Sequence, residues 1–196
     1  MQSRTPPGAE PGPIRADTDS RLSAALASVV AGARRRAVRD GDRQIDTAHL
    51  LHSLLETDPD VRAAFDDGAQ VVRLLGYLVQ RSIGYGLQWQ GTIEDSGSVP
   101  LVKVGDFGPA KEKRWSPSAT AAMEAAIERA DRRGEPRALG VDLLVALIAD
   151  PDYRAVEVLG RAGADPKAII RRIEEAPSTG PYVDPYADPY AGTSAD

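Results

Sequence analysis

The chain has 196 residues and a formal net charge of −5, from 24 Lys and Arg against 29 Asp and Glu. That length allows one ordinary domain or two small helical units, and the charge balance does not favour a nucleic-acid partner. Because the sequence has no cysteine, disulfides, thiolate metal sites and cysteine nucleophiles are excluded. No stretch has the ~20 apolar residues of a membrane span, and prolines stand where a signal peptide would be apolar. We therefore expect a soluble, cytoplasmic protein with no membrane partner.

Both ends of the chain are of low complexity. Residues 1–17 are rich in Pro and Gly and hold almost no large apolar side chain, so burial cannot offset the entropy of ordering them. Residues 177–196 repeat Pro-Tyr-x-Asp with a period of four, and proline at that spacing forbids a helix. We predict a disordered arm at the start and a disordered, extended, acidic tail at the end. The tail is either a solubilising end or a short linear motif for a partner.

Residues 18–83 are predicted to form four helices. The first helix carries an apolar stripe at helical spacing, made of Leu22, Leu26, Val29, Val30 and Ala33. The second helix follows the N-cap types Asp46 and Thr47 and ends before Asp58-Pro59. Its apolar stripe is Leu50, Leu51, Leu54 and Leu55. A short helix from Pro59 and a longer one through residues 71–78 complete this first repeat.

Residues 84–114 break the helical pattern. Leu87, Trp89, Gly91 and Ile93 alternate with polar residues, and the turn-forming residues 95–98 follow them. This alternation predicts a small β-hairpin or an extended arm in the linker. Because an isolated hairpin is marginal in water, we expect Trp89 to lie on the helical body.

The helical pattern then returns in residues 115–176. The motif Asp-Pro-Asp-x-Arg-Ala at Asp58 recurs 92 residues later at Asp150, each time after a leucine-rich helix. Trp115-Ser116-Pro117 opens the helix that corresponds to the first one, with Ser116 as the N-cap. One four-helix unit of this size would hold a modest core. We therefore predict an all-α fold in which two tandem four-helix repeats pack as a pseudo-twofold eight-helix domain.

The double pattern resembles the amino-terminal repeat domain of the Clp family of AAA+ unfoldases, especially its ClpC-like branch. The residues that carry the resemblance in the first repeat are Ile45, Thr47, His49, Leu50, Leu51, Leu54 and Leu55. Those in the second repeat are Trp115, Ser116, Pro117, Ala119, Met123, Gly134, Leu143, Leu144, Ala146, Leu147 and Gly163-Ala164-Asp165. The resemblance covers roughly residues 18–176. No G-x-x-x-x-G-K-[ST] phosphate loop of an ATPase module occurs in the sequence. The resemblance therefore implies a freestanding copy of this amino-terminal domain, which docks partners in the family.

In that family the domain receives substrates and adaptor proteins and, in some members, a peptide antibiotic or a phosphorylated arginine. The peptide surface uses an aromatic residue at the start of the second repeat and apolar residues of the first helix. Trp115, Leu26 and Val30 match that chemistry, and Trp89 of the linker is a further candidate. The resemblance therefore implies a non-enzymatic binding module without a cofactor or metal.

The phosphoarginine site of the family depends on an acidic residue just before the histidine of the helix-opening motif. Ala48 stands there in the first repeat, and the second repeat has Val141 followed by Asp142. We therefore expect the first repeat to lack this site. Asp142 is the one candidate left for it.

Three chemical alternatives remain to be weighed. His49, His52 and Glu56 fall at i, i+3 and i+7, on a helix face opposite the leucine stripe, so we expect them to point away from the core. Zinc sites on one helix favour i, i+4 and need further ligands, so a helix-opening histidine plus a surface histidine is the preferred interpretation. The second alternative is a hydrolase, but the sequence has no Gly-x-Ser-x-Gly turn to hold a serine nucleophile. The arginine runs at 33–39 and 128–137 favour solvated helix ends over nucleic-acid binding.

The sequence thus predicts a peptide- or protein-binding module of the Clp proteolysis system, acting as an adaptor, regulator or decoy. Its expected partners are a ClpC-type unfoldase or the substrates and adaptors of that unfoldase, with cyclic peptide antibiotics as further candidate ligands. The alternative is a stand-alone interaction or sensor protein, unrelated to proteolysis, that works through its Tyr-Pro tail.

Overall fold

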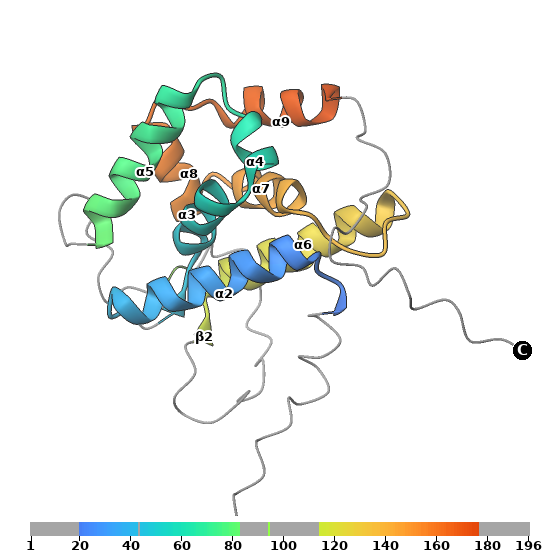
Figure 1. Cartoon of the computed structure of the whole chain (residues 1–196), viewed down its shortest axis with the longest axis horizontal. Coiled ribbons are helices and arrows are strands. Elements are labelled where there is room, and N and C mark those ends of the chain that lie inside the picture. The colour runs from blue at the N-terminus through green and yellow to red at the C-terminus, as the bar shows by residue number, and fades with distance from the viewer. Residues whose placement is uncertain (1–19, 43, 83–93, 95–113, 177–196) are drawn as a thin grey trace, which may run out of the picture.

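The computed structural model describes residues 20–42, 44–82, 94 and 114–176 (Figure 1). The first repeat consists of α2 Ala24–Arg39, β1 Gln44–Ile45, α3 Thr47–Thr57, α4 Pro59–Ala63 and α5 Gly68–Ser82. The second repeat consists of β2 Arg114–Trp115, α6 Pro117–Arg132, α7 Gly140–Ala149, α8 Arg154–Arg161 and α9 Pro166–Glu175. The all-α fold of two four-helix repeats is therefore confirmed. The predicted arm, the linker hairpin with Trp89, and the tail lie outside the described residues.

The predicted N-cap Ser116 is confirmed, because its side chain accepts from the Ala119 amide at 3.1 Å. Ser23, which was not predicted as a cap, does the same for α2 and accepts from the Leu26 amide at 3.2 Å. Pro59, Pro117 and Pro166 stand in the first turns of α4, α6 and α9, where a missing N–H costs nothing. Both α2 and α6 are followed by a glycine with φ of 73°, a conformation that favours glycine over other residues, at Gly41 and Gly134.

The two repeats join through short parallel backbone pairings that repeat with pseudo-twofold symmetry. β1 pairs with β2, and the Ser116 amide donates to the Ile45 carbonyl at 2.9 Å. On the other side Leu22 pairs with Ala138, and the Ser23 amide donates to the Ala138 carbonyl at 3.0 Å. In each case the segment before the first helix of one repeat pairs with the segment before the second helix of the other. The sequence did not predict this exchange.

The core is continuous across the repeats, with α3 and α7 at its centre and α2 along one side (Figure 1). Fully buried leucines of both central helices fill it: Leu50, Leu51, Leu54, Leu55, Leu143, Leu144 and Leu147. Each such side chain stabilises the fold by about 1.5–3 kcal/mol. The helices α2 and α3 approach closely at Gly32, where a Cβ would lie 3.0 Å from the Ser53 Oγ. No helix in the described ranges combines the length and the apolar composition that a membrane span needs.

Candidate partner-binding site

The structure places the predicted peptide-contact residues in different environments. Trp115 and Val30 are half-buried and pack against the core, so each keeps an outward-facing part. Leu26 is fully buried. A peptide on the surface would not contact the Leu26 side chain, so its expected role in binding is replaced by one in core packing. Trp89 lies outside the described residues.

Trp115 and Val30 belong to different repeats, yet the backbone brings their elements together. β1 lies against α2, and β2, which holds Trp115, pairs with β1 in parallel. A binding surface that used both residues would therefore be composite, with one part from α2 of the first repeat and one from β2 of the second.

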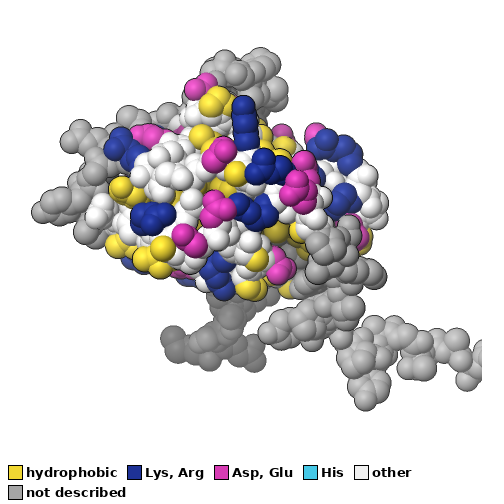
Figure 2. Space-filling model, turned by 90° about the horizontal axis from the view of Figure 1, so that it is seen from above, with side chains coloured by type: hydrophobic (Ala, Val, Ile, Leu, Met, Phe, Trp, Pro, Cys, Tyr) yellow, Lys and Arg dark blue, Asp and Glu magenta, His cyan; other side chains and the backbone are white. Residues whose placement is uncertain are grey.

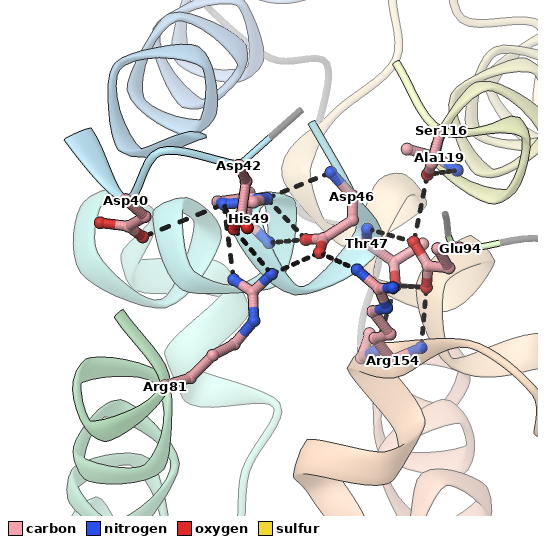
Figure 3. Close-up of polar contacts among 11 residues, drawn as sticks. Asp40, Asp42, Asp46, Thr47, His49, Arg81, Glu94, Ser116, Ala119 and Arg154 are labelled. Carbon is pink, nitrogen blue, oxygen red and sulfur yellow. Dashed lines mark hydrogen bonds and ion pairs between the residues drawn. The ribbon is translucent and has the colours of Figure 1, made fainter. Parts of the chain in front are cut away.

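The joint beside this surface is built on the first turn of α3 (Figure 3). Asp46 is the N-cap: its carboxylate accepts from the His49 amide at 2.9 Å, and the His49 Nδ1 accepts from the Asp46 amide at 3.1 Å. The two residues thus satisfy each other's backbone N–H groups, as in a capping box. Both side chains are buried. His49 is therefore a helix-opening residue, as predicted.

Three carboxylates and a guanidinium surround the His49 ring. Its Nε2 lies 3.1 Å from an Asp42 oxygen, 3.9 Å from an Asp40 oxygen and 3.4 Å from the Arg81 Nη1. Asp40, Asp42 and His49 form a group that could hold a metal ion. Arg81, however, donates to Asp42 at 3.1 Å and already places a cation in the group. The arrangement is that of an ion-pair network, and the absence of a bound metal stays a prediction.

The pKa values of the network follow from its burial and its charges. Burial by itself would raise the pKa of Asp46, but the hydrogen bond from His49 and the nearby charges of His49 and Arg81 outweigh it and hold this pKa well below its usual range. Burial would lower the pKa of His49, but hydrogen bonds to Asp42 and Asp46 outweigh it, so the net shift is upward. The network therefore favours an ionised Asp46 and makes His49 easier to protonate, although protonation at Nδ1 would remove the acceptor of the capping box.

Asp46 also reaches across to the second repeat. Its second oxygen accepts from Arg81 at 2.5 Å and from Arg154, at the start of α8, at 2.8 Å. All three side chains are at least largely buried. Breaking a buried ion pair by removing one partner costs about 3–5 kcal/mol, because the remaining charge is left unpaired. Asp46 therefore couples the first turn of α3 to that of α8.

Glu94, the one linker residue that the structure describes between 83 and 113, completes the joint (Figure 3). Its carboxylate accepts from the Thr47 amide at 2.8 Å, from the Arg154 amide at 2.8 Å and from the Ser116 Oγ at 3.1 Å. The Thr47 hydroxyl also donates to Glu94, and accepts from the Ala155 amide at 3.1 Å. One buried carboxylate thus meets the first turns of α3 and α8 and the N-cap of α6.

The start of α8 depends on the carboxylate of Glu94 as an acceptor because its own N-cap residue provides none. Tyr153 occupies the N-cap position and makes no cap hydrogen bond through its side chain. In the first repeat, the start of α4 is capped by Asp58, which accepts from the Asp60 amide at 3.0 Å and the Val61 amide at 3.2 Å. The Asp58 carboxylate lies where a Cβ of Gly140 would be, 1.9 Å from its Oδ2. Glycine at that position therefore leaves room for the cap.

In the second repeat, Asp142 takes the position of His49 in the first turn of α7. Its carboxylate accepts from the Leu139 amide at 2.9 Å and from the Arg133 Nη2 at 2.7 Å, and lies 3.4 Å from the Arg129 Nε. Arg133 forms a second hydrogen bond to the other Asp142 oxygen, and this pairing raises the pKa of Arg133. Asp142 is fully buried. A phosphoarginine ligand at Asp142 would therefore have to displace Arg133.

His52 is buried, which contradicts the prediction of a surface histidine. Its ring is 3% exposed, and its Nε2 lies 3.3 Å from a Glu56 oxygen without making a hydrogen bond. Burial, and then the positive charges of Arg36 and Arg39, lower the pKa of His52 to about 3. His49 is also buried rather than pointing away from the core. The error arises because α3 is the central helix, enclosed by α2 on the side opposite its leucines.

The arginine runs were predicted to be solvated helix ends, but several of their side chains form ion pairs with acidic residues. Arg36 pairs with Glu56, Arg39 lies 3.3 Å from Asp40, and Arg133 is bound to Asp142. Figure 2 shows Lys and Arg interspersed with Asp and Glu over the face seen from above, with apolar side chains between them. On that face the described residues form no continuous basic patch.

The network residues that sequence analysis missed are Glu94, Arg81, Arg154, Asp40 and Asp42. A signal existed for Arg154, because the repeated Asp-Pro-Asp-x-Arg-Ala motif keeps an arginine in both copies. The two arginines nevertheless do different work. Arg62 donates to the Leu55 carbonyl at 3.1 Å at the end of α3, whereas Arg154 pairs with Asp46.

Comparison with known proteins agrees with this architecture. Residues 114–196 match the family of the Clp repeat (R) N-terminal domain. The N-terminal domain of Hsp104 from Candida albicans superposes with a TM-score of 0.58 at 14% identity, covering 79% of this chain and 89% of that one. The N-terminal domain of the chaperone ClpD from Arabidopsis thaliana gives a TM-score of 0.52 at 18% identity, covering 79% and 95%.

A structure from a malarial protein secretion system also shares the fold, with a TM-score of 0.54 at 13% identity, covering 79% of this chain and 92% of that one. No curated protein matches the sequence. At these identities the solved structures establish the common fold. The family match supports a Clp-type N-terminal repeat in residues 114–196, and the solved N-terminal domains share the fold of this chain.

Proposed function

We propose that the protein is a non-enzymatic protein-binding module of the Clp proteolysis system, working as an adaptor, regulator or decoy for a ClpC-type unfoldase. The observation that carries the proposal is the composite surface, in which half-buried Val30 and Trp115 come from two repeats joined by a buried polar network. Partly exposed apolar and aromatic side chains on a rigid support are the usual anchors of protein interfaces.

The polar groups of the joint support binding rather than catalysis. A hydrolytic site needs a nucleophile, an accessible base and a group that orients the base. The hydroxyls of Thr47 and Ser116 are buried and hydrogen-bonded to Glu94. Both histidines are buried as well. Among the residues described, the two hydroxyls and His49 serve in helix caps and in the joint between the repeats.

The expected partners are the unfoldase itself or the substrates and adaptors that its own amino-terminal domain receives, with cyclic peptide ligands as small probes of the same surface. Adaptor and decoy differ in outcome. An adaptor delivers a client and raises its rate of degradation, whereas a decoy competes for the client and lowers that rate. A degradation assay with added protein therefore separates the two roles.

Isothermal titration of the full chain against a purified ClpC-type unfoldase, and against a cyclic peptide that binds such domains, tests the proposal. We expect Trp115→Ala and Val30→Thr to weaken binding by about tenfold or more, which corresponds to ~1.4 kcal/mol. Lys167→Ala on the outer face of α9 is the control that should leave affinity unchanged. Circular dichroism checks that each variant is folded.

Two results would contradict the proposal. Absence of binding to both the unfoldase and the cyclic peptide would remove the protein from this system. Deletion of residues 177–196 tests the alternative, in which the protein works through its Tyr-Pro tail. If binding survives this deletion, the composite surface carries the interaction; if nearly all binding is lost, the Tyr-Pro tail does.

A further inference from the structure

The outer face of α5 is unusually apolar. Among the described residues, the large hydrophobic side chains that are exposed are Val38, Val72, Tyr77 and Val79, and three of these four lie on α5. Val72 is 68% exposed and Val79 is 48% exposed. Val72, Gly76 and Val79 stand at i, i+4 and i+7, so they share one stripe of the helix. Tyr77 and the exposed Arg73 flank this stripe on one side.

The corresponding helix of the second repeat shows that the fold does not require this stripe. α9 buries Ile169, much as α5 buries Leu74 and Leu78. The outer face of α9 is charged, with exposed Lys167, Arg171, Glu174 and Glu175. Two helices with the same place in a duplicated scaffold thus differ in what they show to solvent. Packing of the repeat therefore does not explain why the outer face of α5 is apolar.

Gly76 sits at the middle of this stripe and has no structural reason to be glycine. It is not among the glycines with positive φ, and a Cβ at this position would meet nothing within 4 Å. Glycine inside a helix is disfavoured relative to alanine. Its effect here is that no side chain stands between Val72 and Val79 on this stripe.

The charges of α5 indicate which occupant suits the stripe. The helix GAQVVRLLGYLVQRS has no acidic residue, and Arg73 is exposed at the edge of the stripe. A complementary segment carries aromatic or apolar side chains interleaved with carboxylates. The tail has this composition, because PYVDPYADPY places Tyr182, Tyr186 and Tyr190 among Asp184 and Asp188.

We propose that the C-terminal tail, residues 177–196, docks on the outer face of α5, with tyrosines against Val72 and Val79 and aspartates toward Arg73. The spacings agree. Tyrosines four residues apart in an extended proline-rich chain are about 12 Å apart. Val72 and Val79 are seven residues apart on a helix, or about 10.5 Å along its axis.

The tail also starts within reach of α5. Arg172 on α9 donates to the Ala64 carbonyl at 2.6 Å and pairs with Asp66, just before α5 begins. Twenty extended residues span up to about 66 Å, against about 22 Å for the whole of α5. Because the tail is tethered, its effective concentration at α5 is of millimolar order, so modest contacts suffice.

Paramagnetic relaxation enhancement in the full chain tests this docking without any partner protein, so the outcome is independent of the proposed function. The chain has no cysteine, which allows a single spin label at Ala187→Cys. We expect amide signals of residues 72–80 to lose most of their intensity while the label is paramagnetic, and signals on the outer face of α9 to lose much less. Equal losses on both helices, or no loss on α5, would overturn the proposal.

Variants of the full chain separate docking from chance proximity. Val72→Ser with Val79→Ser changes exposed side chains only and should restore the α5 signals. The matched pair Lys167→Ser with Arg171→Ser on α9 should leave the losses on α5 unchanged. Mixing isotope-labelled protein without the spin label with unlabelled, spin-labelled protein identifies the source of the effect. Losses on α5 in that mixture would overturn intramolecular docking and assign the surface to a second copy of the chain.

Discussion

The first turns of α3 and α7 make the same backbone-capping hydrogen bond with different side chains. In α3 the side chain of His49 accepts from the N-cap amide of Asp46, and in α7 the side chain of Asp142 accepts from the N-cap amide of Leu139. The residue that ends the preceding helix differs in the same way, because Asp40 is the C-cap of α2 and Arg133 is the C-cap of α6. The duplicated position is thus a hydrogen-bond acceptor in both repeats, and each acceptor suits its neighbour: the carboxylate of Asp142 pairs with Arg133, and the imidazole of His49 lies near Asp40.

The second difference is how the repeats are tied together. Around α3, Asp46 and Glu94 link the first repeat to the start of α8, and Thr47 joins them. Around α7, the equivalent first helical residue is Gly140, which makes space for Asp58. The pseudo-twofold scaffold therefore has one polar joint with a carboxylate from between the repeats, and one that is closed by a local cap. Sequence changes at the two sites should have unequal effects.

The largest effect is expected from giving α3 the N-cap of α7. Asp46→Leu removes the cap and leaves the guanidinium groups of Arg81 and Arg154 without this carboxylate in a buried place. We expect a loss of about 3–5 kcal/mol in the free energy of unfolding, measured by urea denaturation. Leu139→Ala in α7 removes no hydrogen-bonding side chain and should cost clearly less. Similar losses for the two variants would show that the joint is not special.

Glu94→Ala should have the next largest effect. It leaves the Thr47 and Arg154 amides without their acceptor, and each unsatisfied buried group costs about 1–3 kcal/mol. We expect a total loss of about 2–4 kcal/mol in the same denaturation experiment. Glu94→Gln keeps one acceptor oxygen and should lose roughly half as much. A neutral Glu94→Ala variant would mean that the linker carboxylate does not join the repeats.

The pH dependence of stability should separate the two histidines. The folded pKa of His52 is lowered to about 3 from 6.5, so below pH 6.5 the unfolded chain binds a proton that the folded chain refuses. His52 therefore destabilises the fold by about 1.4 kcal/mol for each pH unit below 6.5, or about 2 kcal/mol at pH 5. His52→Val, which installs the residue of the second repeat, should remove this loss between pH 7 and pH 5.

His49 acts with the opposite sign. Its folded pKa is raised, so its stabilising contribution is complete below pH 6.5 and is lost as the pH rises through the folded value. Asp46, with a lowered pKa, contributes above pH 3.8 and does not change in this window. Urea denaturation at several pH values checks both histidines. An unchanged pH dependence in His52→Val would contradict the assignment of His52 as a buried neutral residue.

The smallest effect is expected at Gly140. Gly140→Ala places a methyl group against the Asp58 carboxylate, which must shift away from the amides that it caps. We expect a loss of about 1–2 kcal/mol, the usual worth of an N-cap with some crowding. Gly160→Ala in α8, where a Cβ meets nothing within 4 Å, is the control and should be neutral or slightly stabilising. Thermal unfolding of both variants tests the difference.

The local features of the fold could be predicted from the sequence because they depend on neighbouring residues. Asp46 and Ser116 are good N-cap types, Pro117 suits a first turn, and Asp58-Pro59 ends a helix. The internal repeat then indicated two units and a shared core. Each of these inferences needs only short stretches of chain.

The site was less predictable because its contacts are long-range. Glu94 is 47 residues from Thr47 and 60 residues from Arg154, and no local pattern marks it. The burial of His52 was missed because the leucine stripe indicates one buried face, whereas a central helix is enclosed all round. Leu26 was assigned to a surface from chemistry alone, although its place in the apolar stripe also predicted burial.

The central claim is that one polar joint makes the two repeats a single unit, which the composite surface of Val30 and Trp115 requires. Native-state hydrogen exchange of the buried amides in α3 and α7 tests it most directly. We predict that both helices exchange with the same free energy in the native chain, and that Glu94→Ala lowers this value equally in both. A loss of protection confined to α3 and the first turn of α8, with α7 unchanged, would contradict the claim.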